Sequence, residues 1–250
     1  KGESILLPKE KVNFLKSIYL KCFFLFCHQI FYSCKANRRL FQKIAPKRSF
    51  KPLLCFCDVI PKENIKYKNQ YFHSNKLNLV LCGAFYKLKN FDIIVKVLSN
   101  YPNLKSKLRV HLIGSGETLP SILHNLRKLN VDTINHGYQP PNEVSKILYS
   151  FGDVLMLPSY RDNSPKIVNE AMTVGMPILM SLNCGTVEDL IVENENGFVF
   201  APDDINLIAK RISFFLEDRE KVILMGNNSK KIILNFTPYK AVKNLISELN

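Results

Sequence analysis

The stretch VLMLPSYRDNSPKIVNEAM, residues 154–172, decides the fold of this chain. It opens with four apolar residues, as in a parallel strand that is buried on both faces. A polar loop follows, and the spacing of apolar residues from Pro165 onward predicts a helix. Asn163 or Ser164 is predicted as the N-cap of this helix, with Pro165 in its first turn. A buried strand joined to a helix by a short loop is typical of α/β proteins with a parallel sheet.

The chemistry of this loop suggests a ligand. A helix that starts near Pro165 presents unpaired N–H groups and the positive end of its dipole, which together favour an anion. Two carboxylates flank that position, Asp162 in the loop and Glu170 in the helix. A phosphate at the helix start and carboxylates for sugar hydroxyls are what a nucleotide-sugar site requires. The alternative is that both acids merely complement the helix dipole.

Strands and helices alternate along the chain from Asn78 onward, with short connections. Strands are predicted at 79–82, 109–113, 133–137, 154–157, 177–180 and 197–200, and helices at 91–98, 119–129, 141–149, 165–174, 186–190, 205–216 and 219–231. Asn142 is the predicted cap of the third helix. This alternation predicts a Rossmann-like, doubly wound parallel sheet with helices on both faces and ligands at the carboxyl ends of the strands.

The segment PSYRDNSPKIVNEAMTVGMPIL, residues 158–179, resembles the donor-binding signature of retaining glycosyltransferases of family 4, the glycosyl transferases group 1. That signature consists of Glu, seven residues, Glu-Ala-Met and then Gly-x-Pro. Glu170, Gly175 and Pro177 match it, and Asp162 stands where the family more often has Glu. The resemblance implies a GT-B fold. It also implies metal-independent transfer of a sugar, with retention, from a nucleoside-diphosphate sugar to an acceptor hydroxyl.

Two further loops resemble the same family. GAFYKLKNFDIIV, residues 83–95, resembles its glycine loop, in which Lys89 matches the lysine that binds the donor phosphate. Ala84 stands where the family usually has an arginine, so a bidentate cation for the diphosphate is missing. HLIGSGE, residues 111–117, resembles the glycine-rich turn after the next strand, and Gly114 is its first glycine.

The segment NCGTVEDLIVENENGFVF, residues 183–200, also resembles the family, with Gly185 and Glu188 before an Asn-Gly turn. Glu188 is interpreted as structural. The resemblance extends over residues 78–235 and implies the following site. Asp162 is the catalytic residue and contacts the donor sugar, and Glu170 binds the ribose hydroxyls. The donor diphosphate is bound by the Gly83 and Gly114 loops, Lys89, and the backbone of Asn163, Ser164, Pro165 and Lys166.

The positive charge is concentrated in the first third of the chain. Residues 1–76 hold 16 Lys and Arg against 4 Asp and Glu, a net charge of +12, whereas residues 77–250 carry only +2. One interpretation is that this basic segment binds an anionic membrane surface or an acidic acceptor. Nucleic acid is not expected as a partner, because no recognition motif accompanies the charge. We expect a cytoplasmic protein, and the membrane interpretation of the charge would place it peripherally at the inner face of the membrane.

The cysteines and histidines show no metal-ligand spacing. The seven cysteines fit free thiols in a reducing compartment, with Cys22, Cys27 and Cys82 predicted to be buried. The five histidines are interpreted as core or solvated residues. The stretch from Cys22 to Cys34 is too short to span a bilayer, and the first residues do not resemble a signal peptide.

By resemblance, residues 1–52 are a remnant of an N-terminal acceptor domain and 53–77 an interdomain linker. Residues 78–235 form the nucleotide-sugar-binding domain, and 236–250 a C-terminal helix. An ordinary basic surface helix explains residues 9–43 equally well. The predicted function is a glycosyltransferase that acts on a glycan or lipid-linked acceptor in surface polysaccharide, lipopolysaccharide or glycolipid synthesis. The alternative is a truncated or degenerate transferase that serves as a non-catalytic nucleotide-binding or partner-binding domain.

Overall fold

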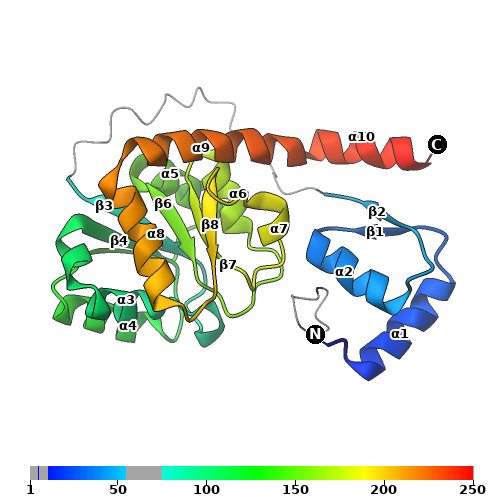
Figure 1. Ribbon diagram of the computed structural model, residues 1–250, viewed down its shortest axis with the longest axis horizontal. Helices are drawn as coiled ribbons and strands as arrows, with labels where there is room; N and C mark the ends of the chain where they lie inside the picture. The colour runs from blue at the N-terminus through cyan, green and yellow to red at the C-terminus, as the bar shows by residue number, and fades with distance from the viewer. Residues whose placement is uncertain (1–4, 6–10, 55–74, 250) are drawn as a thin grey trace.

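The computed structural model describes residue 5, residues 11–54 and residues 75–249. These residues form a small unit (11–54) and a large unit (75–236), and a long C-terminal helix reaches from the large unit to the small one (Figure 1). Most of the predicted linker 53–77, together with Cys55, Cys57 and His73, lies outside the described residues.

The large unit is built on a six-stranded sheet in which every neighbouring pair is parallel. Its spatial order is β5-β4-β3-β6-β7-β8. The strands are β3 (Leu77–Cys82), β4 (Leu108–Ile113), β5 (Asp132–Gly137), β6 (Val154–Leu157), β7 (Ile178–Ser181) and β8 (Gly197–Phe200). All residues of β3, β6 and β7 are buried, whereas the edge strand β5 is partly exposed. The prediction of a parallel α/β sheet is confirmed.

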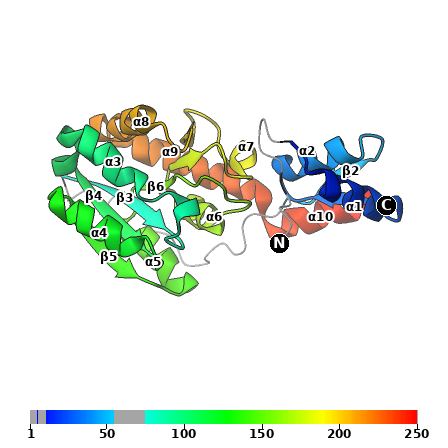
Figure 2. The same ribbon diagram turned by 90° about the horizontal axis from the view of Figure 1, so that it is seen from below.

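Helices cover both faces of this sheet. The helices are α3 (Ile93–Asn100), α4 (Leu119–Lys128), α5 (Pro141–Phe151), α6 (Lys166–Thr173), α7 (Val187–Leu190), α8 (Ile205–Glu217) and α9 (Glu220–Ile233), with 3-10 turns η2 (Lys87–Lys89), η3 (Pro102–Lys107) and η4 (Leu234–Phe236). Helix α3 contacts α4 and α8, while α6 contacts α5 and α9. Figures 1 and 2 show the sheet lying between these two groups. The core is therefore a buried sheet between two helical layers, as its apolar strands require.

The strand order reverses between β3 and β6, which are neighbours in the sheet but not in the sequence. The chain leaves β3 toward β4 and leaves β6 toward β7, so the loops after β3 and β6 diverge. In open parallel sheets such a divergence leaves a crevice at the carboxyl ends of the strands. The loop 83–92 and the loop 158–165 border that crevice.

Two predicted helix caps are wrong. Helix α6 begins at Lys166 with Pro165 as its N-cap, and no side chain caps it. Asn163 and Ser164 do not cap it, because the preceding loop is tied by its backbone to the loop after β7, where Gly185 N donates to Asp162 O at 2.8 Å. Asn142 is also not a cap. It lies inside α5, whose N-cap is Pro140, since two consecutive prolines start that helix two residues earlier than a cap at Asn142 would.

The small unit contains α1 (Phe14–Leu25), β1 (Ile30–Tyr32), α2 (Lys35–Ile44) and β2 (Phe50–Pro52). The two short strands pair in parallel, and Phe24, Ile30, Leu40 and Ile44 form a separate apolar cluster. The segment predicted as a basic surface helix, residues 9–43, therefore contains a short strand between two helices. Cys22 is exposed on α1 and Cys27 is half-exposed, which contradicts their predicted burial, whereas Cys82 is buried as predicted. Cys22 lies on the outward face of the helix, beside the exposed Phe23, whereas Phe24 turns into the apolar cluster.

Helix α2 of the small unit is held by two acids of α7 in the large unit. Lys35 N donates to Asp189 Oδ2 at 3.0 Å, so a carboxylate from the large unit satisfies an N–H in the first turn of α2. Arg39, one turn further on, makes a bidentate ion pair with Glu188 through contacts of 3.0 and 2.8 Å. Burial raises the pKa of the Asp189 carboxyl. Glu188 thus makes a structural contact.

The last helix, α10 (Pro238–Leu249), contacts β2 of the small unit, as Figure 1 shows. The two units are therefore joined by α10 as well as by the contact between α2 and α7. Within the part of the chain that the structure describes, no helix combines the length and the apolar character needed to cross a membrane. How the boundaries 1–52, 53–77, 78–235 and 236–250 divide the chain into domains remains a prediction.

Candidate functional site

A cavity of about 370 Å³ opens at the carboxyl ends of the strands. Gly83 follows β3, Gly114 follows β4, and Glu170 projects from α6, so three predicted site residues meet there. The remaining lining residues come from the ends of β3 and β4 and the loops after them, from the connection between β5 and α5, and from α5 and α6 themselves: Cys82, Ala84, Tyr86, Ile113, Ser115, Tyr138, Gln139, Pro141, Val144 and Ile167. The cavity thus lies against α5 and α6, with a mostly apolar wall and a carboxylate at one side.

One side of the cavity is formed by backbone rather than by side chains. Gly83 and Gly114 have φ angles of 144° and 130°, which favour glycine. A Cβ atom on Gly114 would lie 2.0 Å from Gly83 O, so the two turns touch through their main chains. Gly83 N donates to Ile113 O at 2.9 Å and fixes this contact. Two adjacent glycine turns of this kind let a ligand approach the backbone closely.

Glu170 places a negative charge at the cavity. It lies on α6, one helical turn after Ile167, which also lines the cavity. The pKa of the Cys82 thiol is raised to about 12, first by burial and then by the charge of Glu170. Glu170 is therefore within electrostatic range of the end of β3. A carboxylate in this place can accept hydrogen bonds from the hydroxyls of a polar ligand.

Lys89 and Asp162 do not line this cavity, but they form an ion pair between the loops after β3 and β6. Their side chains are 25% and 12% exposed. The backbone of Asp162 is held on its other side, where Asp162 N donates to Asn183 O at 3.3 Å. A Cβ atom on Gly185 would lie 2.3 Å from Asn163 O, so this approach requires glycine. The structure therefore fixes Asp162 from two neighbouring loops.

The four residues proposed to bind a diphosphate through their backbone lie next to this ion pair. Asn163 is half-buried and Pro165 is buried, while Ser164 and Lys166 are exposed. No side chain caps α6, although Val168 N in its first turn donates to Pro165 O at 3.1 Å. The N–H groups and the dipole at such a helix start favour an anion. Among the described residues, no group of three or more His, Cys, Asp or Glu could hold a metal ion.

Two residues of this region were not anticipated. Asn90 is buried and joins three loops by hydrogen bonds, and Tyr160 donates from its hydroxyl to Asp203 Oδ1 at 2.6 Å. This hydrogen bond, with burial, raises the pKa of Tyr160 to about 12. The only signal for Asn90 in the sequence is its place directly after Lys89 in a turn, because Asn tolerates positive φ. Tyr160 and Asp203 are too far apart in the sequence to be paired by pattern.

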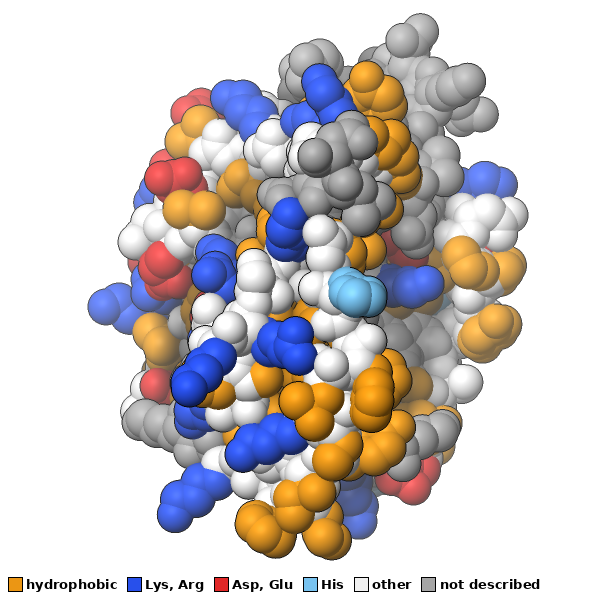
Figure 3. Space-filling view, turned by 90° about the vertical axis from the view of Figure 1, so that its right-hand side faces the viewer, with side chains coloured by type: hydrophobic (Ala, Val, Ile, Leu, Met, Phe, Trp, Pro, Cys, Tyr) orange, Lys and Arg blue, Asp and Glu red, His pale blue; other side chains and the backbone are white. Residues whose placement is uncertain are grey.

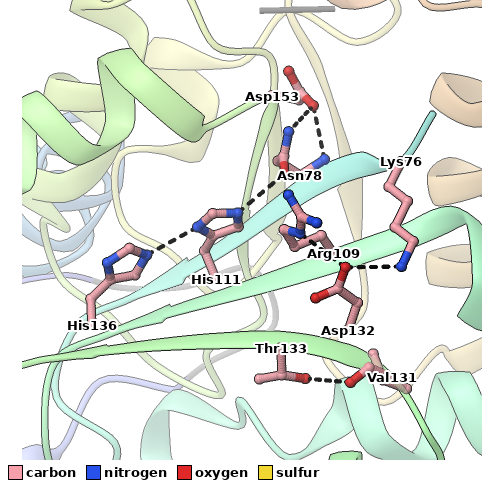
Figure 4. A network of polar contacts seen from close by, with 9 residues as sticks. All are labelled: Lys76, Asn78, Arg109, His111, Val131, Asp132, Thr133, His136 and Asp153. Atoms are coloured by element: carbon pink, nitrogen blue, oxygen red, sulfur yellow. Dashed lines mark hydrogen bonds and ion pairs between the residues drawn. The ribbon is translucent and has the colours of Figure 1, made fainter. Parts of the chain in front are cut away.

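A second polar group lies in the same sheet but outside the cavity (Figure 4). Asn78 donates through Nδ2 to the buried Asp153, which directs Asn78 Oδ1 toward His111 Nε2 at 3.1 Å. Burial above all lowers the pKa of His111 to about 4, and burial also lowers the pKa of His136, so both rings are neutral at pH 7. A neutral His111 that donates from Nε2 to Asn78 accepts at Nδ1, which lies 3.0 Å from His136 Nε2.

The cavity lies at the carboxyl ends of parallel strands, near the switch point between β3 and β6 where the strand order reverses. This arrangement is typical of α/β proteins that bind a ligand in such a crevice. The chain belongs to the glycosyl transferases group 1, whose family model matches residues 63–232. This match includes all three loops that carry the candidate site.

The chain is similar in sequence to named bacterial glycosyltransferases. The capsular polysaccharide biosynthesis glycosyltransferase CapM of Staphylococcus aureus is 24% identical over 180 residues, 69% of this chain and 46% of CapM. The UDP-Gal:alpha-D-GlcNAc-diphosphoundecaprenol alpha-1,3-galactosyltransferase of Escherichia coli is 25% identical over 194 residues, 75% of this chain and 49% of that enzyme. The chain thus spans about half the length of these relatives.

The fold has a close counterpart in Anabaena Alr3699/HepE, whose structure was solved in complex with UDP. The two superpose with a TM-score of 0.78 at 16% identity, over 98% of this chain and 70% of HepE. This likeness confirms the predicted GT-B fold. Because the superposition covers nearly the whole chain, the small unit also has a counterpart in HepE.

Proposed function

We propose that this chain is the donor-binding part of a retaining family 4 glycosyltransferase. The reaction would transfer a sugar from a nucleoside-diphosphate sugar to an acceptor hydroxyl. One observation carries the proposal: Gly83, Gly114 and Glu170 surround a single cavity at the switch point of the sheet. The Lys89–Asp162 ion pair joins the two loops that border the crevice.

The proposed roles follow from this arrangement. The nucleoside occupies the cavity, where the glycine turns allow close approach and Glu170 accepts hydrogen bonds from the ribose hydroxyls. The diphosphate lies at Lys89 and the uncapped start of α6, which supply positive charge without a metal ion. Asp162 neutralises Lys89 in the unliganded protein. When the diphosphate forms an ion pair with Lys89, the Asp162 carboxylate loses this partner and can contact the donor sugar.

The acceptor side of the reaction is also part of the proposal. The relatives are named for capsular polysaccharide synthesis and for a diphosphoundecaprenol-linked substrate. A glycan or lipid-linked acceptor in polysaccharide, lipopolysaccharide or glycolipid synthesis therefore fits the family. Retention at the anomeric carbon is proposed from the Asp162–Glu170 signature. This chain spans about half the length of these relatives, so the activity of the whole protein is likewise proposed.

A non-catalytic nucleotide-binding domain is the second candidate, and Ala84 favours it. Ala84 lines the cavity at the position where the family usually has a diphosphate-binding arginine. Calorimetry with UDP, GDP, ADP and dTDP tests the site itself. Binding of one diphosphate together with hydrolysis or transfer of the matching sugar supports the enzyme. Binding without turnover of any matching nucleotide sugar supports the second candidate.

The role of Glu170 is tested by Glu170→Ala. We expect this change to weaken nucleoside diphosphate binding by about 1–3 kcal/mol, the usual cost of losing a charged hydrogen-bond partner. Glu195→Ala is the control, because Glu195 is exposed and lies after α7, away from the cavity. An unchanged dissociation constant in Glu170→Ala would contradict the ribose role.

We further propose that the protein works at the cytoplasmic face of a membrane. The small unit exposes Phe14, Leu15, Ile18, Tyr19 and Phe23 along α1. Figure 3 shows hydrophobic side chains on this side of the molecule beside Lys and Arg. Each basic residue near an anionic leaflet contributes about 1 kcal/mol before screening. Cosedimentation with phosphatidylserine vesicles should therefore be strong at low salt and weak at high salt. Binding that ignores lipid charge would exclude this placement.

A further inference from the structure

Asn90 joins three loops at the carboxyl edge of the sheet. Its Nδ2 group donates to Pro158 O at 3.1 Å and to Pro202 O at 2.8 Å. Asn90 itself ends the turn after β3, Pro158 directly follows β6, and Pro202 lies just beyond β8. The side chain is almost fully buried, with 1% exposed. One amide group therefore ties together loops that are widely separated in the sequence.

The orientation of this amide is fixed by its partners. Both acceptors are carbonyl oxygens, so only the NH₂ group of Asn90 can face them. The other atom, Asn90 Oδ1, is buried and has no hydrogen-bond partner among the described residues. A buried acceptor without a partner destabilises a fold. The Asn90 side chain therefore stabilises this edge of the sheet only through the two hydrogen bonds that it donates.

Asn90 also has an unusual backbone conformation. Its φ angle is 54°, in the left-handed region, where Asn is tolerated far better than most residues. This conformation ends the turn η2 directly after Lys89. A second link supports the first, because Tyr160 N donates to Leu88 O at 2.9 Å. The turn that carries Lys89 and the loop that carries Asp162 are thus joined at two points besides the ion pair.

We infer that Asn90 is a positioning residue for the donor site. It holds the backbone of the turn after β3 against the loop after β6, so that the Lys89 ammonium and the Asp162 carboxylate stand opposite each other before a donor arrives. A long lysine side chain keeps its place only if its backbone is anchored, and small misplacements of binding groups are costly. The part of this inference that concerns the donor rests on the proposed function.

The test is Asn90→Gly, because glycine keeps the left-handed backbone and removes only the side chain. The matched control is Asn130→Gly, a residue with a φ angle of 56° that is exposed at the end of α4. Two quantities are measured on each protein. One is the dissociation constant for UDP and GDP, and the other is the rate of Lys89 acetylation by acetic anhydride, normalised to the exposed Lys107.

We expect Asn90→Gly to weaken nucleotide binding roughly tenfold, the scale set by one or two lost hydrogen bonds. Acetylation of Lys89 should become severalfold faster, because the ammonium group is no longer held at Asp162. Asn130→Gly should leave both quantities unchanged. If Asn90→Gly does not fold, Asn90→Asp removes the donors while tolerating the same backbone conformation.

A lower melting temperature with an unchanged dissociation constant and unchanged Lys89 reactivity would overturn the inference and leave Asn90 a purely structural residue. If the wild-type protein binds no nucleoside diphosphate, the proposed function fails instead. The acetylation rate still decides in that case, because it measures the position of Lys89 without any ligand.

Discussion

Lys89 and Asp162 are 73 positions apart in the sequence, yet their side chains form an ion pair. The sheet order explains this contact, because β3 and β6 lie side by side and each of the two residues follows one of these strands. The pair therefore marks the place where the strand order reverses. It also sets two charges of opposite sign against each other where a charged ligand is proposed to bind.

The ion pair predicts that its two members act on nucleotide affinity with opposite sign. Asp162→Asn should tighten the binding of a nucleoside diphosphate about fivefold, because the diphosphate no longer competes with a carboxylate for Lys89. Lys89→Ala should weaken binding about tenfold or more, because a charged hydrogen bond is lost. Isothermal titration calorimetry measures both. Equal weakening in the two variants would show that Asp162 does not compete with the ligand.

Ala84 offers a gain-of-function experiment. Its side chain lines the cavity that also contains Glu170. Ala84→Arg should tighten diphosphate binding about tenfold, because a guanidinium group can bind two phosphate oxygens at once. Ala84→Leu is the control, since it adds volume without charge and should not tighten binding. A guanidinium that weakens binding as much as leucine would mean that the diphosphate lies elsewhere.

The contact between Arg39 and Glu188 predicts a measurable coupling between the two units. Their side chains are 32% and 38% exposed, so solvent screening limits the coupling energy to about 1 kcal/mol or less. A double-mutant cycle of Arg39→Ala and Glu188→Ala in urea unfolding measures this energy. Hydrogen exchange should become faster in α2 and stay unchanged in β6. Faster exchange throughout the large unit would contradict a role confined to the contact between the units.

The buried His111 predicts a loss of stability in acid. The pKa of His111 is about 4 in the folded protein, below its ordinary value of 6.5, so folding favours the neutral ring. The contribution of the neutral His111 ring to the free energy of unfolding is complete above about pH 6.5. It is lost as the pH falls toward 4, and the loss amounts to about 3 kcal/mol at most. Urea unfolding from pH 7 to pH 4 measures it. His111→Gln should flatten the pH dependence, whereas His124→Gln, at an exposed position, should not.

Much of the fold was predictable because its strands are short apolar runs with clear ends. Val154–Leu157 and Gly197–Phe200 are strands with the predicted bounds, and the parallel order follows from alternation with helices. The edge strand β5 gave a weaker pattern because it is partly exposed. The cap of α6 was wrong because a tertiary contact decided it: the Asp162 loop is tied to Gly185 rather than turned back on α6. The cap of α5 was wrong because two consecutive prolines start that helix before Asn142.

The site was predictable only in part, and for a similar reason. Gly83, Gly114 and Glu170 carry local motifs, and the structure brings them to one cavity. The roles of Lys89, Asp162 and the 163–166 backbone in donor binding remain predictions. Asn90 acts through backbone carbonyls of Pro158 and Pro202, whose positions depend on the whole sheet. No pattern of neighbouring residues could have indicated those partners.

The strand order also bears on how the protein is made. Of the six strands of the large sheet, β3, β4 and β5 leave the ribosome before the others, but the second neighbour of β3 is β6, which emerges only after α5. Until then one edge of β3 stays unpaired, and Leu77–Cys82 is almost entirely apolar. An open apolar strand edge is a template for aggregation during synthesis. A nascent chain that pauses before Val154 should therefore depend on chaperones, and codons that slow translation there should lower the soluble yield.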